Sequence, residues 1–427
     1  MSYLTERRTD RHLSMGIGAL WIAALLFQSI LSLTPWPDNL FRMDFISFWT
    51  AASLMRDGSG PLLADLDTQR AFQVQLRLEE ATTQEIRLAP GYNPYPNPPP
   101  LALPFLPLTL LPLPWAYLLW WLLSLSAFCV AVSMPLRGRP LGRTWTVVML
   151  SFGGVTSTLI EGQPYGFFLL AFVSALLAMA SGRSLLGGLL LGLLCLKPQY
   201  AVLFGLVFLV KRRWTELAGM SITAFGVGIL SLVMVGPAGI MGYVGLLQRI
   251  GGFHSSLVHP TAMINWRAVL IHLWPSIPDS TGSFLTLVLG AATVLATLLA
   301  WQGEWLPSSP RFALQMLVLT MATIVASPHS HFHGTVLLLA PVALARNPVG
   351  SPLARVWHPL LVFGYLLALI LWPLGEWRWL LVPYILVMIA LLTLQCRLSP
   401  PFGYEPGHVP GMARQEVKGN TEAWRAD

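Results

Sequence analysis

Three polar features stand out in the 427-residue chain because apolar sequence surrounds each of them. The first is Asp44, which lies in Met43-Asp44-Phe45-Ile46-Ser47-Phe48-Trp49. A carboxylate in such surroundings is suited to act as a general base toward a hydroxyl group, since burial and a neighbouring cation tune its pKa. The structural alternative is an N-cap for the helix that follows, a position that aspartate fills well.

The second feature is Lys197, which lies midway through a long apolar run over about residues 185–210. A lone ammonium group is costly inside a membrane, so we expect an anionic partner. The phosphate of a lipid headgroup suits this role. An ion pair with Asp44 or Glu161 is the structural alternative.

The third feature is a group of histidines, His329, His331 and His333, which follows Ser327-Pro328. Their alternate spacing places them on one face of an extended chain. Hydrogen bonds to a phosphorylated substrate, an interfacial cluster and a metal site all stay open. Zinc is the weakest of the three, because His-x-His-x-His is not one of its common structural patterns. We therefore predict no cofactor, with a divalent metal as the lesser alternative.

The elements that must position these residues are apolar segments. The chain is 55% hydrophobic and 11% charged, whereas soluble globular domains are about 25% charged. Its net charge of +7 comes from short arginine clusters between apolar runs rather than from one basic face, which argues against nucleic acid as a partner. The composition predicts an all-α polytopic membrane protein surrounded by membrane lipids.

The arginine clusters also set the orientation of the chain, because cytoplasmic loops carry the excess of positive charge. We predict a cytoplasmic leader over residues 1–13, a retained first membrane helix over about residues 15–33, and a single transmembrane domain over residues 14–397. About 12 segments (roughly 10 to 13) cross the membrane. The polar tail, residues 398–427, is predicted to be cytoplasmic and disordered. The later crossing segments are residues 115–134, 145–160, 166–180, 185–210, 217–235, 284–300, 312–326, 334–345, 360–372 and 379–394.

The run over residues 185–210 is too long for one crossing, and both of its ends are basic. We predict two short half-helices that meet outward at Lys197-Pro198-Gln199, since proline breaks a helix. Two long loops, about residues 35–100 and 236–283, are predicted to be extracytoplasmic, and the first contains an amphipathic helix over residues 65–78. This threading places the candidate polar residues on the extracytoplasmic side.

Short motifs in this sequence resemble glycosyltransferase family 87. The first are Asp44-Phe45-x-x-Phe48-Trp49-x-Ala51-Ala52, Gly58 and Tyr95-Pro96-Asn97-Pro98-Pro99. In the same order as in the family there follow Gly162-Gln163-Pro164, Gly188-x-x-x-Gly192-x-x-x-x-Lys197-Pro198-Gln199, Arg212-Arg213-Trp214, Asn265-Trp266 and Ser327-Pro328-His329. Single motifs are weak signals, but the ordered set covers about residues 40–345.

The resemblance implies a GT-C-type bundle that moves a sugar, mannose or another hexose or pentose, from a polyprenyl phosphate to a lipid or glycan acceptor outside the cytoplasm. It implies that Asp44 is the general base of an inverting transfer. Lys197, with His329 or His331, would face the departing phosphate. The predicted substrate-binding and phosphate-binding residues are Lys197, Gln199, His329, His331, Gln163, Asn265, Arg267, Tyr95 and Asn97.

Two other classes of function remain open at this stage. A transporter or flippase of lipid-linked sugars would also use many helices and a broken hairpin. A catalytically inactive assembly partner could retain the same fold. Long outer loops rich in Pro, Trp and Tyr, and the lack of a clear internal repeat, favour an enzyme. The sugar, acceptor and oligomeric state are not predicted.

Overall fold

The computed structural model describes residues 38–81, 84–87, 91–138, 142–345 and 354–398. Over these residues the protein is a bundle of helices, and its single β-bridge joins Met263 to His331. The all-α prediction is therefore confirmed for the described part. The predicted leader, the first membrane helix over residues 15–33, and nearly all of the polar tail lie outside the described residues.

The helices follow one another with short connections. Those of the first half are α2 (Phe45–Arg56), α3 (Leu66–Glu80), α4 (Gln84–Arg87), α5 (Leu113–Ser133), α6 (Gly142–Leu150), α7 (Gly153–Glu161), α8 (Tyr165–Ala180), α9 (Ser184–Gly192) and α10 (Pro198–Val210). Those of the second half are α11 (Trp214–Gly251), α12 (Trp266–Leu273), α13 (Asp279–Leu298), α14 (Pro310–Ala326), α15 (Leu339–Leu344), α16 (Ala354–Leu371) and α17 (Leu381–Leu398). Short 3-10 helices include η3 (Pro99–Leu110), η5 (Leu193–Leu196), η9 (Phe332–Leu338) and η10 (Trp372–Leu380).

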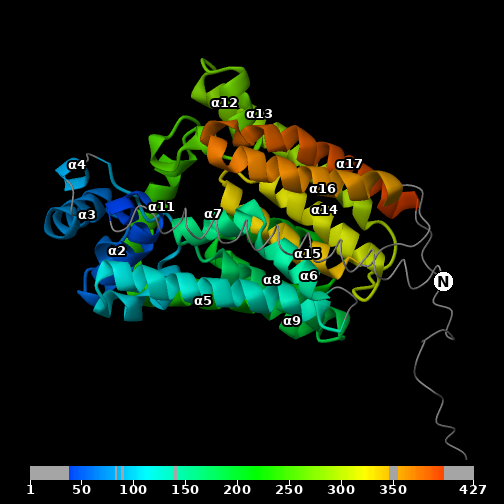
Figure 1. Ribbon diagram of the computed structural model, residues 1–427, viewed down its shortest axis with the longest axis horizontal. Coiled ribbons are helices and arrows are strands. Elements are labelled where there is room, and N and C mark those ends of the chain that lie inside the picture. Colours follow the sequence, from blue (N-terminus) through cyan, green and yellow to red (C-terminus); the bar gives the residue numbers. More distant parts are fainter. Residues whose placement is uncertain (1–37, 82–83, 88–90, 139–141, 346–353, 399–427) are drawn as a thin grey trace, which may run out of the picture.

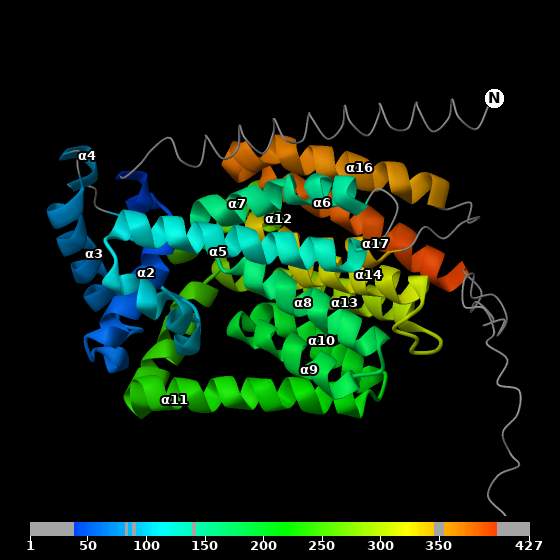
Figure 2. The same ribbon diagram turned by 60° about the horizontal axis from the view of Figure 1, so that its bottom comes forward.

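The long helices run in roughly one direction, while α2, α3 and α4 gather at one end of the bundle (Figures 1 and 2). Among the described residues, four helical stretches are long and apolar enough to cross a membrane: Leu113–Leu136, Trp214–Gly251, Asp279–Trp301 and Pro373–Leu398. Shorter apolar helices of 10–17 residues accompany them. The chain is thus a helical membrane protein, and the total of about 12 crossings stays a prediction.

The predicted break at Lys197 is confirmed. Helix α9 ends at Gly192, η5 continues to Leu196, and α10 begins at Pro198. Lys197 itself has φ −132° and ψ 79°, outside the helical region. Proline fits the first position of α10 because no backbone N–H is needed there.

Two predicted segments differ from the structure. Residues 145–160 do not form one helix but two, α6 and α7, because Ser151 turns its hydroxyl back to the Val147 carbonyl and two glycines follow Phe152. The predicted helix end at Val235 is confirmed, because Gly236 is non-helical with φ 67° and ψ 177°. The residues after it, predicted as part of an outer loop, form a second helix that ends at Gly251 and shares the label α11. Pro237 is tolerated because it lies in the first turn of this second helix.

Helices α9 and α11 pack with their backbones in close contact, and Figure 2 shows them side by side. A Cβ atom on Gly188 would lie 2.1 Å from the Glu216 carbonyl oxygen, and one on Gly219 would lie 2.4 Å from that of Leu185. Small residues permit such contacts between membrane helices. The pair of glycines therefore holds the hairpin that carries Lys197 against the long helix α11.

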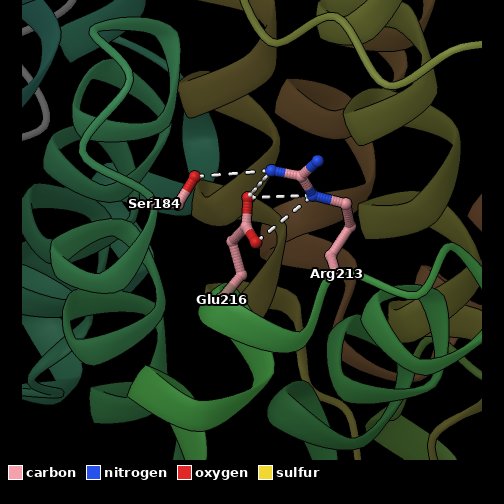
Figure 3. A network of polar contacts seen from close by, with 3 residues as sticks. All are labelled: Ser184, Arg213 and Glu216. Atoms are coloured by element: carbon pink, nitrogen blue, oxygen red, sulfur yellow. Dashed lines mark hydrogen bonds and ion pairs between the residues drawn. The ribbon is translucent and has the colours of Figure 1, made fainter.

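A buried ion pair secures the same interface (Figure 3). The Glu216 side chain is 0% exposed, and its Oε1 accepts from Nη2 of Arg213 at 2.7 Å and from Nε at 3.1 Å. Arg213 Nη2 also lies 3.4 Å from the Ser184 hydroxyl at the start of α9. The charge of Glu216 is thus compensated almost entirely by one residue.

We expect Arg213→Ala to lower the unfolding free energy by about 2 kcal/mol, because it leaves a buried carboxylate unpaired while Arg213 itself is 33% exposed. Thermal unfolding of the purified protein in detergent measures this loss. The double variant Arg213→Ala/Glu216→Gln should recover most of it, and Arg183→Ala, on the neighbouring exposed turn, is the control. A double variant no more stable than Arg213→Ala would contradict this account.

Candidate functional site

A cavity of about 760 Å³ lies where the start of α2, helix α3, the α7–α8 turn, Lys197 and the segment before η9 meet. Six of the ten site residues predicted from the sequence line it. They are Asp44, Asn97, Gln163, Lys197, His329 and His331. Residues separated by up to about three hundred positions in the chain thus share one wall, which makes this cavity the candidate site.

Gln163 connects the predicted base to the predicted phosphate ligand. Its Nε2 donates to Oδ2 of Asp44 at 2.5 Å, and its Oε1 accepts from Nζ of Lys197 at 3.1 Å. Asp44 occupies the N-cap position of α2, but its side chain makes no capping hydrogen bond, so its carboxylate is not used as a cap. The amide stands between the two charged groups, so their link runs through Gln163.

The turn that presents Gln163 depends on Gly162. This residue ends α7 in the left-handed conformation, with φ 67°, which glycine adopts without a steric penalty. A Cβ atom on Gly162 would lie 2.6 Å from Cβ of Phe45, the residue after Asp44. Only glycine lets the α7–α8 turn approach the start of α2 this closely, and that approach brings Gln163 to Asp44.

A second carboxyl group lies beside the first. Oε2 of Glu161 accepts from the backbone N–H of Asp44 at 3.4 Å. Burial raises the pKa of Asp44, and the hydrogen bond from Gln163 and the charge of Lys197 oppose this rise. Burial and the charge of Asp44 raise the pKa of Glu161. Because Gln163 and Lys197 stabilise the carboxylate of Asp44, Glu161 is the member of the pair that retains a proton.

The extended segment on which the shared face of the three histidines depends is short, because His331 is extended but His333 lies in η9. Ile264 N–H donates to the Ser330 carbonyl at 2.8 Å, and His331 pairs with Met263. The rings of His329 and His331 lie 5.0 Å apart. Burial, with the charge of Lys197, lowers the pKa of His331 to about 3, so its ring is neutral and can both donate and accept.

Metal ligation has no geometric support within the described ranges, where no group of three or more His, Cys, Asp or Glu side chains could hold an ion. The absence of a cofactor therefore stays a prediction. Nδ1 of His329 is buried without a hydrogen-bond partner. A buried ring nitrogen without a partner is available to a bound group.

The structure places four predicted site residues away from the cavity wall. Tyr95 donates its hydroxyl to the Pro98 carbonyl at 3.0 Å, and Gln199 is half-buried in the first turn of α10. Asn265 caps α12 and donates to the Ser327 carbonyl at 3.0 Å. Arg267 donates to the Phe253 carbonyl at 2.8 Å. The last two anchor the loop beside the histidines, and a substrate contact for any of the four stays a prediction.

Several residues of the cavity were missed from the sequence. They include the tyrosines Tyr165 and Tyr200 and the cations Arg42, Arg70, Arg77 and Arg378. Arg70 and Arg77 occupy positions i and i+7 of the predicted amphipathic helix, so their common face was a signal that could have been used. Arg378 gave no such signal, because its place depends on how η10 packs against η9, where its guanidinium lies 5.6 Å from the Phe332 ring.

Comparison with known proteins gives a consistent picture. The model of glycosyltransferase family 87 matches residues 95–328, more than half of the chain. The polyprenol-phosphate-mannose-dependent alpha-(1-2)-phosphatidylinositol pentamannoside mannosyltransferase of Mycolicibacterium smegmatis is 29% identical over 252 residues. These residues are 58% of this chain and 59% of that protein.

The protein of the same name from Mycobacterium tuberculosis is 28% identical over 262 residues, which are 58% of this chain and 57% of that protein. The chain thus spans less than two thirds of the length of these relatives. No solved structure matches it significantly. The family match contains Gln163 and Lys197, and Gln163 links Lys197 to Asp44 in the cavity. On this match, the chain belongs to glycosyltransferase family 87.

Proposed function

We propose that this protein is a membrane glycosyltransferase that transfers a sugar, in first place mannose, from a polyprenyl phosphate to a lipid or glycan acceptor. Membership of the family and the names of the two relatives support this proposal. The observation that carries it is the link from Asp44 through Gln163 to Lys197 in one cavity. A base and a cation held a fixed distance apart suit a transfer between a hydroxyl group and a phosphate.

In the proposed reaction the acceptor hydroxyl attacks the anomeric carbon of the donor, and its proton passes to the carboxylate of Asp44. The bond from that carbon to the phosphate oxygen breaks as the new glycosidic bond forms, so the configuration inverts. The departing polyprenyl phosphate carries the negative charge. Lys197 and the neutral rings of His329 and His331 stabilise that charge from the cavity wall.

The extracytoplasmic side of the membrane is part of the proposal. It rests on the arginine pattern, which places the α7–α8 turn and the break at Lys197 on the side away from the basic loops. Accessibility of a single cysteine introduced at the exposed residue Gly91, probed with an impermeant maleimide in intact cells, tests this side. Labelling that occurs only after the membrane is permeabilised would show that this side of the protein faces the cytoplasm.

The function itself is tested with purified protein in neutral lipid nanodiscs, radiolabelled polyprenyl phosphates carrying mannose, another hexose or a pentose, and a membrane lipid extract as the acceptor pool. We expect labelled lipid product from the mannosyl donor, with the anomeric configuration opposite to that of the donor. Transfer from another donor would reassign the sugar. No transfer from any donor would favour the transporter or the inactive assembly partner.

Gln163→Leu is expected to lower kcat/KM by about tenfold and to move the acid limb of the pH profile to higher pH. The hydrogen bond from Gln163 holds the pKa of Asp44 down, so its loss raises that pKa and removes the carboxylate form at a higher pH. Initial rates across the pH range measure both effects. Gln75→Leu, on the exposed face of α3, is the control, and an unmoved acid limb would exclude this role for Gln163.

A further inference from the structure

The cavity carries more positive than negative side chains among the described residues. Five cations line it, Arg42, Arg70, Arg77, Lys197 and Arg378, against the two carboxyl groups of Asp44 and Glu161. A polyprenyl-phosphate donor brings one phosphate, and the proposed function assigns that phosphate to Lys197. Arg70 and Arg77 are not used for that phosphate, and their charge indicates that a second anionic group enters the cavity.

Arg77 is the least compensated of these cations. It lies on α3, is 2% exposed, and donates from Nη1 to the carbonyl of Gly91. Its Nε and Nη2 are buried and have no hydrogen-bond partner. Leaving charged donors unsatisfied in a buried position is costly, so such atoms are expected to meet a ligand.

Arg70 adds a second positive charge on the same face of α3, two helical turns before Arg77. It is exposed at the cavity wall. Burial and the neighbouring charge of Arg70 lower the pKa of Arg77. Within the described residues neither arginine forms an ion pair, although Asp67 lies in the first turn of the same helix. The carboxylate of Asp65 accepts from the backbone N–H of Thr68 at 2.7 Å and caps α3.

This pair is separate from the Lys197 group. Arg70 and Arg77 belong to α3, at the outer edge of the bundle in Figure 1, whereas Lys197 lies in the broken hairpin between η5 and α10. Asn93 joins the two regions, because its backbone N–H donates to Oε1 of Gln73 on α3 and its Nδ2 donates to the carbonyl of Met43, next to Asp44. A molecule that contacts Arg77 can therefore also reach the carboxylate of Asp44 through the same cavity.

We propose that Arg77, assisted by Arg70, binds an anionic phosphodiester headgroup of the acceptor lipid. Nε and Nη2 of a guanidinium form a fork that matches two oxygens of one phosphate. The identification of this lipid as the acceptor rests on the proposed function. The anion site itself is inferred from the buried guanidinium of Arg77 on α3, whose Nε and Nη2 have no hydrogen-bond partner.

The test is direct binding, which needs no transfer. Purified full-length protein in neutral detergent is titrated with dioctanoyl phosphatidylglycerol as the anionic probe, dioctanoyl phosphatidylcholine as the zwitterionic probe, and inorganic phosphate. We expect the anionic lipid to bind about tenfold more tightly than the zwitterionic one. Arg77→Gln should lower the affinity for the anionic lipid by about tenfold. Arg77→Lys should retain part of the affinity. Arg249→Gln, an exposed arginine outside the cavity, is the matched control.

Unchanged affinity of Arg77→Gln for phosphatidylglycerol would overturn the site. If inorganic phosphate binds as tightly as the lipid, with the same dependence on Arg77, the assignment to a lipid headgroup is wrong and the site binds free phosphate. Because Arg70 is exposed, the Arg70→Gln protein should fold normally. Its affinity for phosphatidylglycerol should be about threefold lower than that of the wild type. The unliganded Arg77→Gln protein should be no less stable than wild type, because an uncompensated buried charge has been removed.

The outcome for this site is distinguishable from the outcome for the proposed function. Asp44→Asn should bind phosphatidylglycerol as wild type does, because Asp44 contacts the attacking hydroxyl rather than the headgroup. Binding that depends on Arg77 in a protein that transfers no sugar would retain the anion site and reject the enzyme. If Arg77→Gln transfers sugar normally with an unchanged KM for the acceptor, the enzyme function is retained and the acceptor headgroup site at Arg77 is rejected.

Discussion

Asp44→Asn is expected to reduce sugar transfer by roughly a hundredfold or more, because the substitution keeps the size of the side chain and removes its basicity. The amide can still accept from Gln163, so the link to Lys197 is retained. Initial rates with saturating donor measure the loss. Donor affinity should change far less than kcat, since Asp44 acts on the acceptor hydroxyl.

The pH dependence of the wild type follows from the same residue. Transfer requires the carboxylate form of Asp44, and burial raises its pKa above the ordinary value of about 3.9. Activity should therefore fall, as the pH decreases, earlier than it would for an exposed aspartate. Asp38→Asn, outside the cavity lining, is the control for loss of one acid. An Asp44→Asn enzyme with wild-type kcat would remove Asp44 from the mechanism.

Lys197→Met is expected to lower kcat/KM for the donor by roughly a hundredfold or more, because the departing phosphate loses its buried counter-charge. Methionine fills the space of the lysine stem without its charge. Lys197 lies within 3.1 Å of Oε1 of Gln163 and 5.0 Å from the Tyr165 ring centroid, so its amine is held in place before substrate enters. Transfer rates at varied donor concentration, together with binding of labelled donor, measure the effect.

Two comparisons sharpen this result. Lys197→Arg keeps the charge but changes the geometry of its donors, and it should restore part of the activity. Lys211→Gln removes a lysine at the far end of α10, where it donates to the Trp301 carbonyl at 3.0 Å, and should leave the donor KM unchanged. Equal activity of Lys197→Met and wild type would assign the phosphate to other cations of the cavity.

Local signals in the sequence were sufficient for the elements around Lys197. Pro198 and Lys197 are adjacent, basic residues flank the apolar run on both sides, and the break between η5 and α10 lies where these signals predict. The helix α3 was also predictable, since its observed range Leu66–Glu80, capped by Asp65, follows the apolar periodicity. Asp44, Gln163 and Lys197 were placed on one side by topology, which is why they could be grouped without a structure.

Other features depend on contacts between distant residues. The division of residues 145–160 into α6 and α7 is coupled to η9, since a Cβ atom on Gly154 would lie 2.6 Å from the Thr335 hydroxyl. The Gly236-Pro237 pair predicts the end of the first helix of α11 correctly, whereas the second helix, which ends at Gly251, was missed. The role of Arg77 depends on how α3 packs against the loop at Gly91, and periodicity carries no information on that.

The break at Lys197 also affects the electric field of the cavity. Because α10 begins at Pro198, directly after the lysine, the positive end of its helix dipole lies at the backbone of Lys197. The amine can lose its proton at high pH, whereas the dipole of a helix cannot be titrated. Part of the attraction for a phosphate is therefore built into the backbone, and it persists under conditions that neutralise the side chain.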